Sequence, residues 1–336
     1  MRIGLVALSS VVPPVEFEAG CEVLRSHGFE LIRHPQVLSQ HWLHAGSDAV
    51  RVQALMDFAF DPAIDVVWCA RGGYGAARLL PLLDRLTAER GLPPRKLLVG
   101  YSDVTVAHEY VRNRWNWSTL HAAMPAAAGF PLLPVADLAA TAAAVARKPA
   151  IDWPWRHTRL RWVTPPPPSP LEAPLIGGNL SLWQCLAGTP YAPPRRPHIL
   201  FLEDLGEKFY RIDRMMTHLD QSGLLDTCVA IVLGDFTDCN DEVQTCLAAS
   251  PGPPAAEKSA TPARQPLRPV FQFDDLLEQT FGSLGLKRNL PVAFGLPVGH
   301  GQRHAPLPLG GLYRLHPEGM LELIHWSWTS ETSTVM

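Results

Sequence analysis

A serine stands where a short apolar segment gives way to a helical pattern. Residues 97–100 are apolar, and the positions after Ser102 have helical spacing. This setting is typical of a nucleophile elbow, whose sharp strand-to-helix turn exposes the hydroxyl and whose helix N-terminus offers free N–H groups to a developing anion. The usual Gly-x-Ser-x-Gly spacing fails at Val104. The alternative is that Ser102 is only an N-cap, with Asp103 favourable to the helix dipole.

Two further residues could complete a nucleophilic site with this serine. A serine hydroxyl needs a base, and the base needs an orienting acid. His300 stands between two glycines after an apolar run, and Glu203 and Asp204 follow the apolar run 198–202. The order serine, glutamate, histidine matches that of α/β-hydrolases. The alternatives are that His300 is an ordinary turn residue and that the two acids face water.

A glycine-rich loop follows another predicted strand, at residues 65–69. Clustered glycines let a backbone approach a ligand closely and present its N–H groups. Residues 71–75 read Arg-Gly-Gly-Tyr-Gly and open a helical pattern. A dinucleotide fingerprint counted from Gly73 would need glycine at position 78, which is Arg78, and the loop follows the third strand rather than the first. The loop is either a ligand-binding backbone or a tight turn without a ligand.

The N-terminal half alternates strands and helices. Hydrophobic patterning predicts strands over 3–8, 29–32, 65–69, 97–100 and 119–121, and helices over 17–26, 47–60, 104–112 and 135–147. Such alternation predicts a parallel sheet with helices on its faces, and therefore an α/β fold. Further on, strands are predicted over 198–202, 229–233, 291–294, 313–315 and 321–326, with helices over 211–219 and 276–281.

The length of 336 residues fits two domains. We expect an N-terminal α/β domain over 1–150, a proline-rich linker over 151–172 that contains four consecutive prolines, and a C-terminal domain over 173–336. A proline run cannot join a helix or a sheet interior. Residues 239–269 lack periodicity and are rich in Pro, Ala and Ser, which predicts a flexible surface insertion.

Charge and cysteine usage exclude several classes of protein. The net charge is −3 without a long basic run, which argues against a nucleic-acid partner. The six cysteines form no Cys-x-x-Cys pair, so they indicate reduced core residues rather than a zinc site, although a Cys239–Cys246 disulfide stays open. No apolar stretch has membrane-spanning length, and the apolar start favours a core strand over a signal peptide.

Several separated motifs together resemble the LD-carboxypeptidase family of serine peptidases, the muramoyltetrapeptide carboxypeptidases. The resemblance covers nearly the whole chain. The family's pattern is Gly-[Phe/Tyr]-Ser-Asp, which does not require glycine at position 104, so Val104 is not a departure from it. The motifs lie at 71–75, 100–103, 176–180, 202–204, 210–214, 234–236 and 299–301. The resemblance implies a flavodoxin- or Rossmann-like parallel-sheet domain and a smaller β-rich C-terminal domain, often in a homodimer.

The same resemblance implies roles for particular residues. Ser102 would be the nucleophile, His300 the general base and acid, and Glu203 the residue that orients His300. The backbone N–H groups of Gly73 and Asp103 would form the oxyanion hole. For substrate contacts, Arg71, Tyr74 and Arg211 are candidates, the arginines because a guanidinium fork suits a carboxylate, although each could instead form a structural ion pair. The resemblance implies no metal and no cofactor.

The implied reaction releases the terminal D-alanine of a murein tetrapeptide. The amide joins that residue to the L-centre of diaminopimelate or lysine, and the tripeptide product belongs to cytoplasmic cell-wall recycling. Two alternatives stay open. One is a self-immunity hydrolase of the same fold that cleaves a microcin C-type conjugate. The other is a non-catalytic protein that binds a nucleotide or a cell-wall fragment at the glycine loop.

Overall fold

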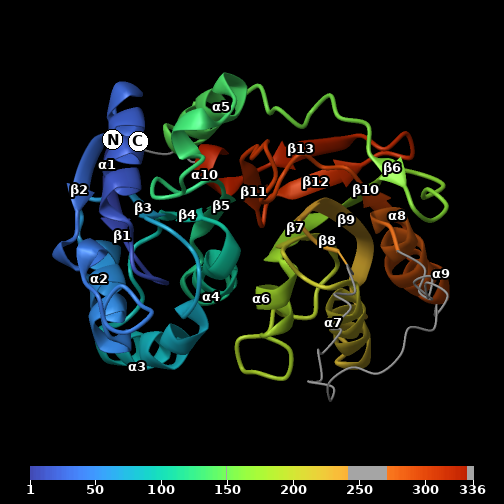
Figure 1. Ribbon diagram of the computed structural model, residues 1–336, viewed down its shortest axis with the longest axis horizontal. Helices are drawn as coiled ribbons and strands as arrows, with labels where there is room; N and C mark the ends of the chain where they lie inside the picture. The colour runs from blue at the N-terminus through green and yellow to red at the C-terminus, as the bar shows by residue number, and fades with distance from the viewer. Residues whose placement is uncertain (149, 241–270, 331–336) are drawn as a thin grey trace, which may run out of the picture.

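The computed structural model describes residues 1–148, 150–240 and 271–330. Two α/β halves lie side by side, the N-terminal one blue to teal and the C-terminal one yellow to red (Figure 1). This confirms the predicted fold class of a parallel-sheet domain followed by a β-rich one. Position 240 is the last described residue before the gap, so most of the insertion predicted over 239–269, with Cys246, lies outside the described residues.

The N-terminal sheet has the strand order β2-β1-β3-β4-β5, all parallel, with β11 added antiparallel at the β5 edge. This is the flavodoxin-like doubly wound order, in which ligands bind outside the carboxyl ends of the strands. The strands are β1 (Arg2–Val6), β2 (Glu30–Arg33), β3 (Val66–Cys69), β4 (Leu97–Gly100), β5 (Ser118–His121) and β11 (Leu307–Leu309).

Helices cover both faces of this sheet. They are α1 (Pro14–Ser26), α2 (Asp48–Phe60), α3 (Leu80–Arg90), α4 (Thr105–Trp115) and α5 (Val135–Val145). Ser47 caps α2 by accepting from the Val50 N–H, and proline occupies the first turn of α1, where no N–H is needed. Strands β3 and β4 are buried at every position, which explains their continuous apolar sequence.

The C-terminal sheet has the order β13-β12-β7-β8-β9-β10-β6. Its centre, β7 to β10, is parallel, and the flanking strands are antiparallel. The strands are β6 (Arg161–Trp162), β7 (Leu171–Asn179), β8 (His198–Leu205), β9 (Cys228–Thr237), β10 (Val292–Phe294), β12 (Leu312–Leu315) and β13 (Leu321–His325), and the helices are α6 (Leu180–Gln184), α7 (Phe209–Gln221), α8 (Phe273–Leu276), α9 (Ser283–Arg288) and α10 (Ser327–Ser330).

Three strands of the structure were not predicted from the sequence, namely β6, β7 and β11. Strand β7 begins beside the proline run, whose composition obscured it. Strand β11 is only three residues long and belongs to the far sheet. In addition, the short helix predicted over 276–281 is the middle of a longer one, in which a π-helical segment (Leu277–Gly282) separates α8 from α9. The segment predicted as a linker contains β6, which pairs with β10.

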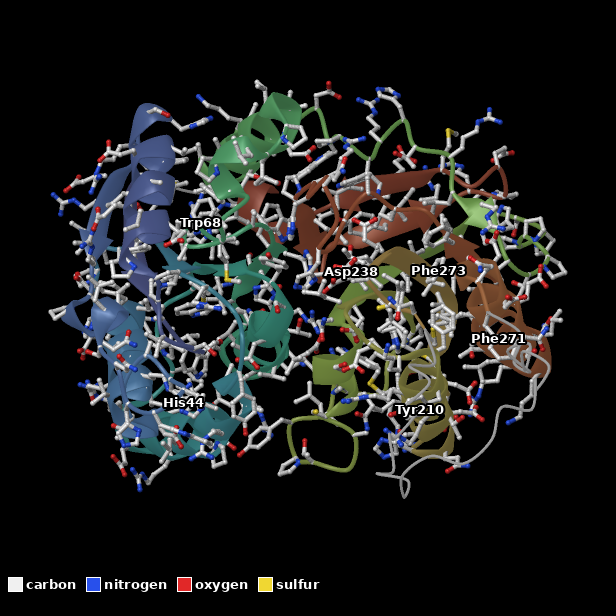
Figure 2. All side chains as sticks on the ribbon, in the orientation of Figure 1. His44, Trp68, Tyr210, Asp238, Phe271 and Phe273 are labelled. Atoms are coloured by element: carbon white, nitrogen blue, oxygen red, sulfur yellow. The ribbon has the colours of Figure 1, made fainter. Side chains whose placement is uncertain are left out.

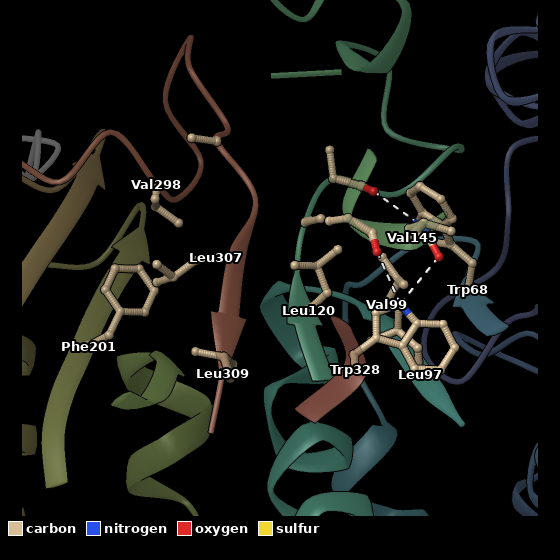
Figure 3. Packing of buried hydrophobic residues seen from close by; sticks show 14 of the residues in the cluster. Trp68, Leu97, Val99, Leu120, Val145, Phe201, Val298, Leu307, Leu309 and Trp328 are labelled. Atoms are coloured by element: carbon tan, nitrogen blue, oxygen red, sulfur yellow. Dashed lines mark hydrogen bonds between the residues drawn. The ribbon is translucent and has the colours of Figure 1, made fainter. Parts of the chain in front are cut away.

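Strand β11 comes from the C-terminal part of the chain but pairs with β5 of the N-terminal sheet, so one hydrophobic core extends across both halves. Leu307 lies near Phe201 of β8 and Val298, and the ring of Trp328 donates to the carbonyl oxygens of Ala144 and Val145 (Figure 3). Helix α10 therefore packs on the N-terminal half, as Figure 1 also shows. Within the described part of the chain, no helix has the length and apolar character needed to cross a membrane.

The burial of β11 predicts a stability effect. Leu309→Ala removes a side chain that is 1% exposed and should lower the free energy of unfolding by about 2–5 kcal/mol, because the cavity left behind cannot collapse fully. Leu132→Ala, at an 84% exposed position, is the matched control and should stay within about 0.5 kcal/mol of the parent. Urea unfolding measures both. Equal midpoints for the two variants would contradict the packing of β11.

Candidate active site

Ser102 stands at a strained strand-to-helix turn. It follows β4 directly and begins a short 3-10 turn (Ser102–Val104) that continues into α4. Its φ is +61°, a left-handed value that costs a residue with a side chain about 1–3 kcal/mol and persists only where the surroundings enforce it. The turn thus has the geometry of a nucleophile elbow rather than that of an ordinary N-cap, for which an extended backbone is usual.

The glycine loop packs directly against this elbow. A Cβ added to Gly72 would lie 2.9 Å from the Ser102 Cβ, so only glycine fits this approach. From the other side, the buried Asp103 carboxylate accepts the Ala76 N–H at 2.8 Å. Ser10, in the segment that follows β1, accepts the Tyr74 N–H at 3.0 Å. The loop is therefore fixed at the carboxyl ends of β1, β3 and β4.

His300 and Glu203 form a hydrogen-bonded pair in the C-terminal half. The Nδ1 atom of His300 lies 2.6 Å from Oε2 of Glu203, whose side chain is fully buried. The pairing of Nδ1 with a carboxylate leaves Nε2 as the nitrogen that can accept a proton. His300 thus has the arrangement of an oriented general base.

The loop around His300 is shaped by its glycines and by Asp235. Gly299 has φ +142°, and a Cβ there would lie 3.2 Å from Oε2 of Glu203 and 3.0 Å from the Asp235 Cβ. Asp235, near the end of β9, donates its N–H to the Val298 carbonyl at 3.0 Å. The absence of side chains on both sides of His300 lets the loop settle onto these two acids.

Aromatic rings join the elbow to the histidine loop. The Tyr101 ring, one residue before Ser102, lies 4.7 Å from the His300 ring and 4.2 Å from that of His304 (centroid distances). His121, at the end of β5, stacks on His304, and its Nε2 lies 3.7 Å from Oε1 of Glu203. That separation is within ion-pair range but longer than a hydrogen bond. The buried carboxylate thus has one histidine beside each oxygen.

The charges of this cluster shift its pKa values in opposite directions. Burial opposes ionisation of Glu203, but His300 and His121 outweigh it and hold the pKa of Glu203 far below its usual range. Burial likewise opposes the imidazolium of His300, but the Glu203 carboxylate prevails and raises the pKa of His300 above 6.5. Burial, followed by the charge of Glu203, raises the pKa of Asp204 and of Asp235 to about 6 in each case.

Contacts between the two halves hold the elbow and the acid strand in register. The Asn179 N–H, at the end of β7, donates to Oγ1 of Thr105 in α4 at 3.1 Å. The Asn179 side chain caps α6 and also donates to Asp204 at 2.9 Å. Trp183 of α6 donates to the buried Glu109 of α4 at 3.3 Å. Helix α4, which follows Ser102, is therefore fixed to β7, the neighbour of the strand β8 that contains Glu203.

The other predicted substrate contacts lie in two different places. Arg71 is close to the site, since it donates to the Val11 carbonyl at 2.7 Å and its charge acts on Tyr101. Tyr74 is 52% exposed on the glycine loop. Arg211 pairs with Glu207 at 2.7 Å on α7, next to Tyr210, which Figure 2 labels in the lower part of the C-terminal half. Arg211 lines a separate hollow with Ser181, Cys185 and His218.

Sequence reasoning did not assign roles to Tyr101, His121, Asp235 or His304. His121 and Asp235 both stand at or near the carboxyl end of a predicted strand, the edge at which open α/β sheets bind ligands, so this position was an available signal. No sequence signal marks His304. Within the described ranges, no group of three or more His, Cys, Asp or Glu side chains could hold a metal ion. Of the cysteines described, four are buried and Cys185 is exposed, all of them free.

Comparisons with known proteins agree with the predicted family and fold. Residues 3–122 match the model of the LD-carboxypeptidase N-terminal domain, and residues 172–315 match that of the C-terminal domain. The murein tetrapeptide carboxypeptidase of Pseudomonas aeruginosa is 32% identical over 324 residues, which cover 92% of this chain and 91% of the relative.

Solved structures show the same architecture. The muramoyltetrapeptide carboxypeptidase of Oxalobacter formigenes superposes with a TM-score of 0.71 at 27% identity, covering 96% of this chain and 98% of that one. The microcin C7 self-immunity protein MccF superposes with a TM-score of 0.72 at 19% identity, covering 97% and 96% of the two chains. At that identity, the likeness to MccF shows the fold alone.

The buried pair predicts a measurable pKa. In the parent, the His300 imidazole should titrate above pH 6.5 in an NMR titration. Glu203→Gln should lower that pKa, because burial is then opposed only by the smaller effects of the Asp204 and Asp235 charges. Glu318→Gln, at an exposed turn, is the control and should leave the titration unchanged. A His300 pKa that is the same in all three proteins would contradict the pairing.

Proposed function

The chain belongs to the LD-carboxypeptidase family, and we propose that it is a serine carboxypeptidase that removes the terminal D-alanine from murein tetrapeptides. The observation that carries this proposal is the Glu203–His300 pair, 2.6 Å apart, together with a serine held at a φ of +61° whose neighbour Tyr101 lies 4.7 Å from the His300 ring. An unpaired acid or a relaxed turn would suit a binding protein equally well. A strained serine next to an oriented base suits nucleophilic catalysis.

The proposed reaction begins with Ser102. Nε2 of His300 takes the hydroxyl proton while Oγ attacks the carbonyl carbon of the diaminopimelate or lysine residue. The tetrahedral intermediate collapses as His300 gives its proton to the leaving amine of D-alanine, and an acyl-enzyme remains. Water then attacks this ester, with His300 again as base, and the tripeptide leaves with a free carboxylate. Glu203 stabilises the imidazolium that forms in both steps.

The developing oxyanion would be bound by backbone N–H groups. We assign these to Gly73 and Asp103, in the glycine loop and the first turn after the elbow. The Asp103 carboxylate, by holding the Ala76 N–H, fixes the two segments relative to each other. Donors that are already in place when charge develops are worth about 10²–10³-fold in rate each.

The substrate class rests on the relatives. The Pseudomonas aeruginosa protein is named a murein tetrapeptide carboxypeptidase and the Oxalobacter formigenes structure a muramoyltetrapeptide carboxypeptidase. We therefore propose a free murein tetrapeptide as substrate. From the family resemblance alone we also propose a role in cytoplasmic cell-wall recycling and a homodimeric state. Arg71 and Tyr74 remain proposed substrate contacts on the glycine loop.

A direct test is incubation of the purified protein with the disaccharide-free tetrapeptide, followed by mass spectrometry. The parent should release one D-alanine, and Ser102→Ala should lose about 10³–10⁶-fold in kcat. Ser26→Ala, at an exposed position at the end of α1, is the matched control and should keep full activity. A fluorophosphonate probe should label the parent but not Ser102→Ala.

The outcomes separate the candidate functions. Release of D-alanine by Ser102→Ala at the parental rate would contradict the assigned nucleophile. Labelling without release of D-alanine would leave a serine hydrolase with another substrate, and a microcin C-type conjugate would then be tested next. If the parent is not labelled by the probe and does not release D-alanine, the result would favour a binding protein.

The pKa of His300 also predicts the pH dependence of catalysis. The imidazole must be neutral to accept the Ser102 proton, and its pKa is raised above 6.5. The value of kcat/KM should therefore rise with pH through a limb whose midpoint lies above 6.5. Glu203→Gln should move this limb to lower pH and reduce kcat by about 10⁴-fold, because the imidazole loses its orienting partner. A limb that stays in place in Glu203→Gln would contradict the assignment of His300.

A further inference from the structure

A hollow of about 590 Å³ opens beside His300, on the side formed by the N-terminal half. One wall is the loop over 301–304, and the other is the segment that follows β5, over 123–134. Tyr101 and His300 form its end toward the elbow. Arg303 is the only permanently charged side chain among the described residues that line it. The rest of the wall is largely apolar, with Phe130, Leu133 and Pro134.

The proposed reaction dictates which part of the substrate lies next to His300. The imidazole must hand its proton to the leaving amine, so the leaving residue has to lie on the His300 side of the scissile bond. The acyl part remains on Ser102, toward the glycine loop. A cavity beside His300 is therefore on the side of the departing amino acid.

We propose that this hollow receives the terminal D-amino acid and that Arg303 binds its free carboxylate. The inference rests on the proposed function and adds to it a residue that would restrict the enzyme to substrates with a free C-terminus. The other arginine near the site, Arg71, lies on the glycine loop, which the acyl part would contact instead.

The contacts of Arg303 suit this role. Its side chain is 46% exposed, and its Nη2 lies 3.4 Å from Oδ1 of Asp137 and 3.5 Å from the Pro154 carbonyl oxygen. Asp137 is fully buried and also accepts the His304 N–H at 3.1 Å, so the anchor is rigid. Both contacts engage the same nitrogen, so within the described residues no contact occupies the N–H groups of Nε and Nη1. Each of these groups can donate a charge-assisted hydrogen bond to a carboxylate.

The size and polarity of the hollow define the side chains it accepts. The volume of about 590 Å³ is far more than the methyl group of alanine needs. Apolar walls disfavour a charged side chain, because an unpaired charge there would lose its hydration. The site should therefore take D-residues with uncharged side chains, D-leucine as well as D-alanine, provided that the α-carboxylate is free.

The test compares two substrates, the tetrapeptide with a free D-alanine carboxylate and the same peptide ending in D-alaninamide. The parent should prefer the acid over the amide in kcat/KM by about 10- to 100-fold, as expected for a charged hydrogen-bonded pair. Arg303→Met should collapse this ratio to about one, chiefly through KM for the acid. Arg303→Lys keeps the cation and the partner of Asp137, and should keep part of the preference.

Two further variants make the result decisive. Arg159→Met, at an exposed position, is the matched control and should keep the parental ratio. If Arg71→Met collapses the ratio and Arg303→Met does not, the carboxylate binds at the glycine loop and the proposal is overturned. A parent that cleaves acid and amide with the same kcat/KM would also overturn it while leaving the proposed function intact. A parent that cleaves neither peptide would instead refute the proposed function.

Discussion

The structure depends most on a carboxylate buried between two histidines. Removing the Glu203 charge from water costs several kcal/mol unless partners replace the lost hydration. His300 replaces it at one oxygen, 2.6 Å away, and His121 lies beside the other. Next to this oxygen the His300 loop passes through Gly299 with a φ of +142°, a backbone conformation that favours glycine. The need to neutralise one charge thus determines the path of a whole loop.

The Glu203 carboxylate has histidines on both sides only because strands of the two halves end next to each other. His121 ends a strand of the N-terminal sheet, whereas Glu203 ends a strand of the C-terminal one. Strand β11 comes from the far end of the chain and pairs with β5, so that Leu307 lies opposite His121. The Asn179–Thr105 hydrogen bond joins helix α4, which follows the serine, to the end of β7 in the C-terminal sheet. The relative position of elbow, base and acid is therefore a property of the interface between the domains.

The two sides of the site differ in chemistry. Backbone N–H groups, a glycine loop and the strained Ser102 form the side on which the proposed oxyanion would develop. The His300 side is aromatic and apolar, with Tyr101 against the imidazole and Arg303 at the edge of the hollow. Burial raises the pKa of Tyr101 to about 12, so its hydroxyl stays neutral beside the ionised Glu203. A neutral ring there limits the access of water without adding a second charge.

The sequence alone determined the parallel-sheet fold of the N-terminal half, because strands buried on both faces and capped helices leave local patterns. It also marked Ser102, Glu203 and His300 as candidates, since each follows an apolar run at the edge where open sheets bind ligands. It missed the two-residue β6 inside the predicted linker, β7, whose start is hidden beside the proline run, and β11, whose three residues carry no pattern of their own.

Only the tertiary structure decided which candidates meet. Arg71 and Arg211 looked alike as carboxylate partners, yet one lies near Tyr101 and the other pairs with Glu207 on α7. His121, Asp235 and His304 come to lie beside the Glu203–His300 pair through contacts across long stretches of chain. The physical reason is that strand and helix patterns are local, whereas the pairing of a buried charge is set by residues about a hundred positions apart, such as Glu203 and His300.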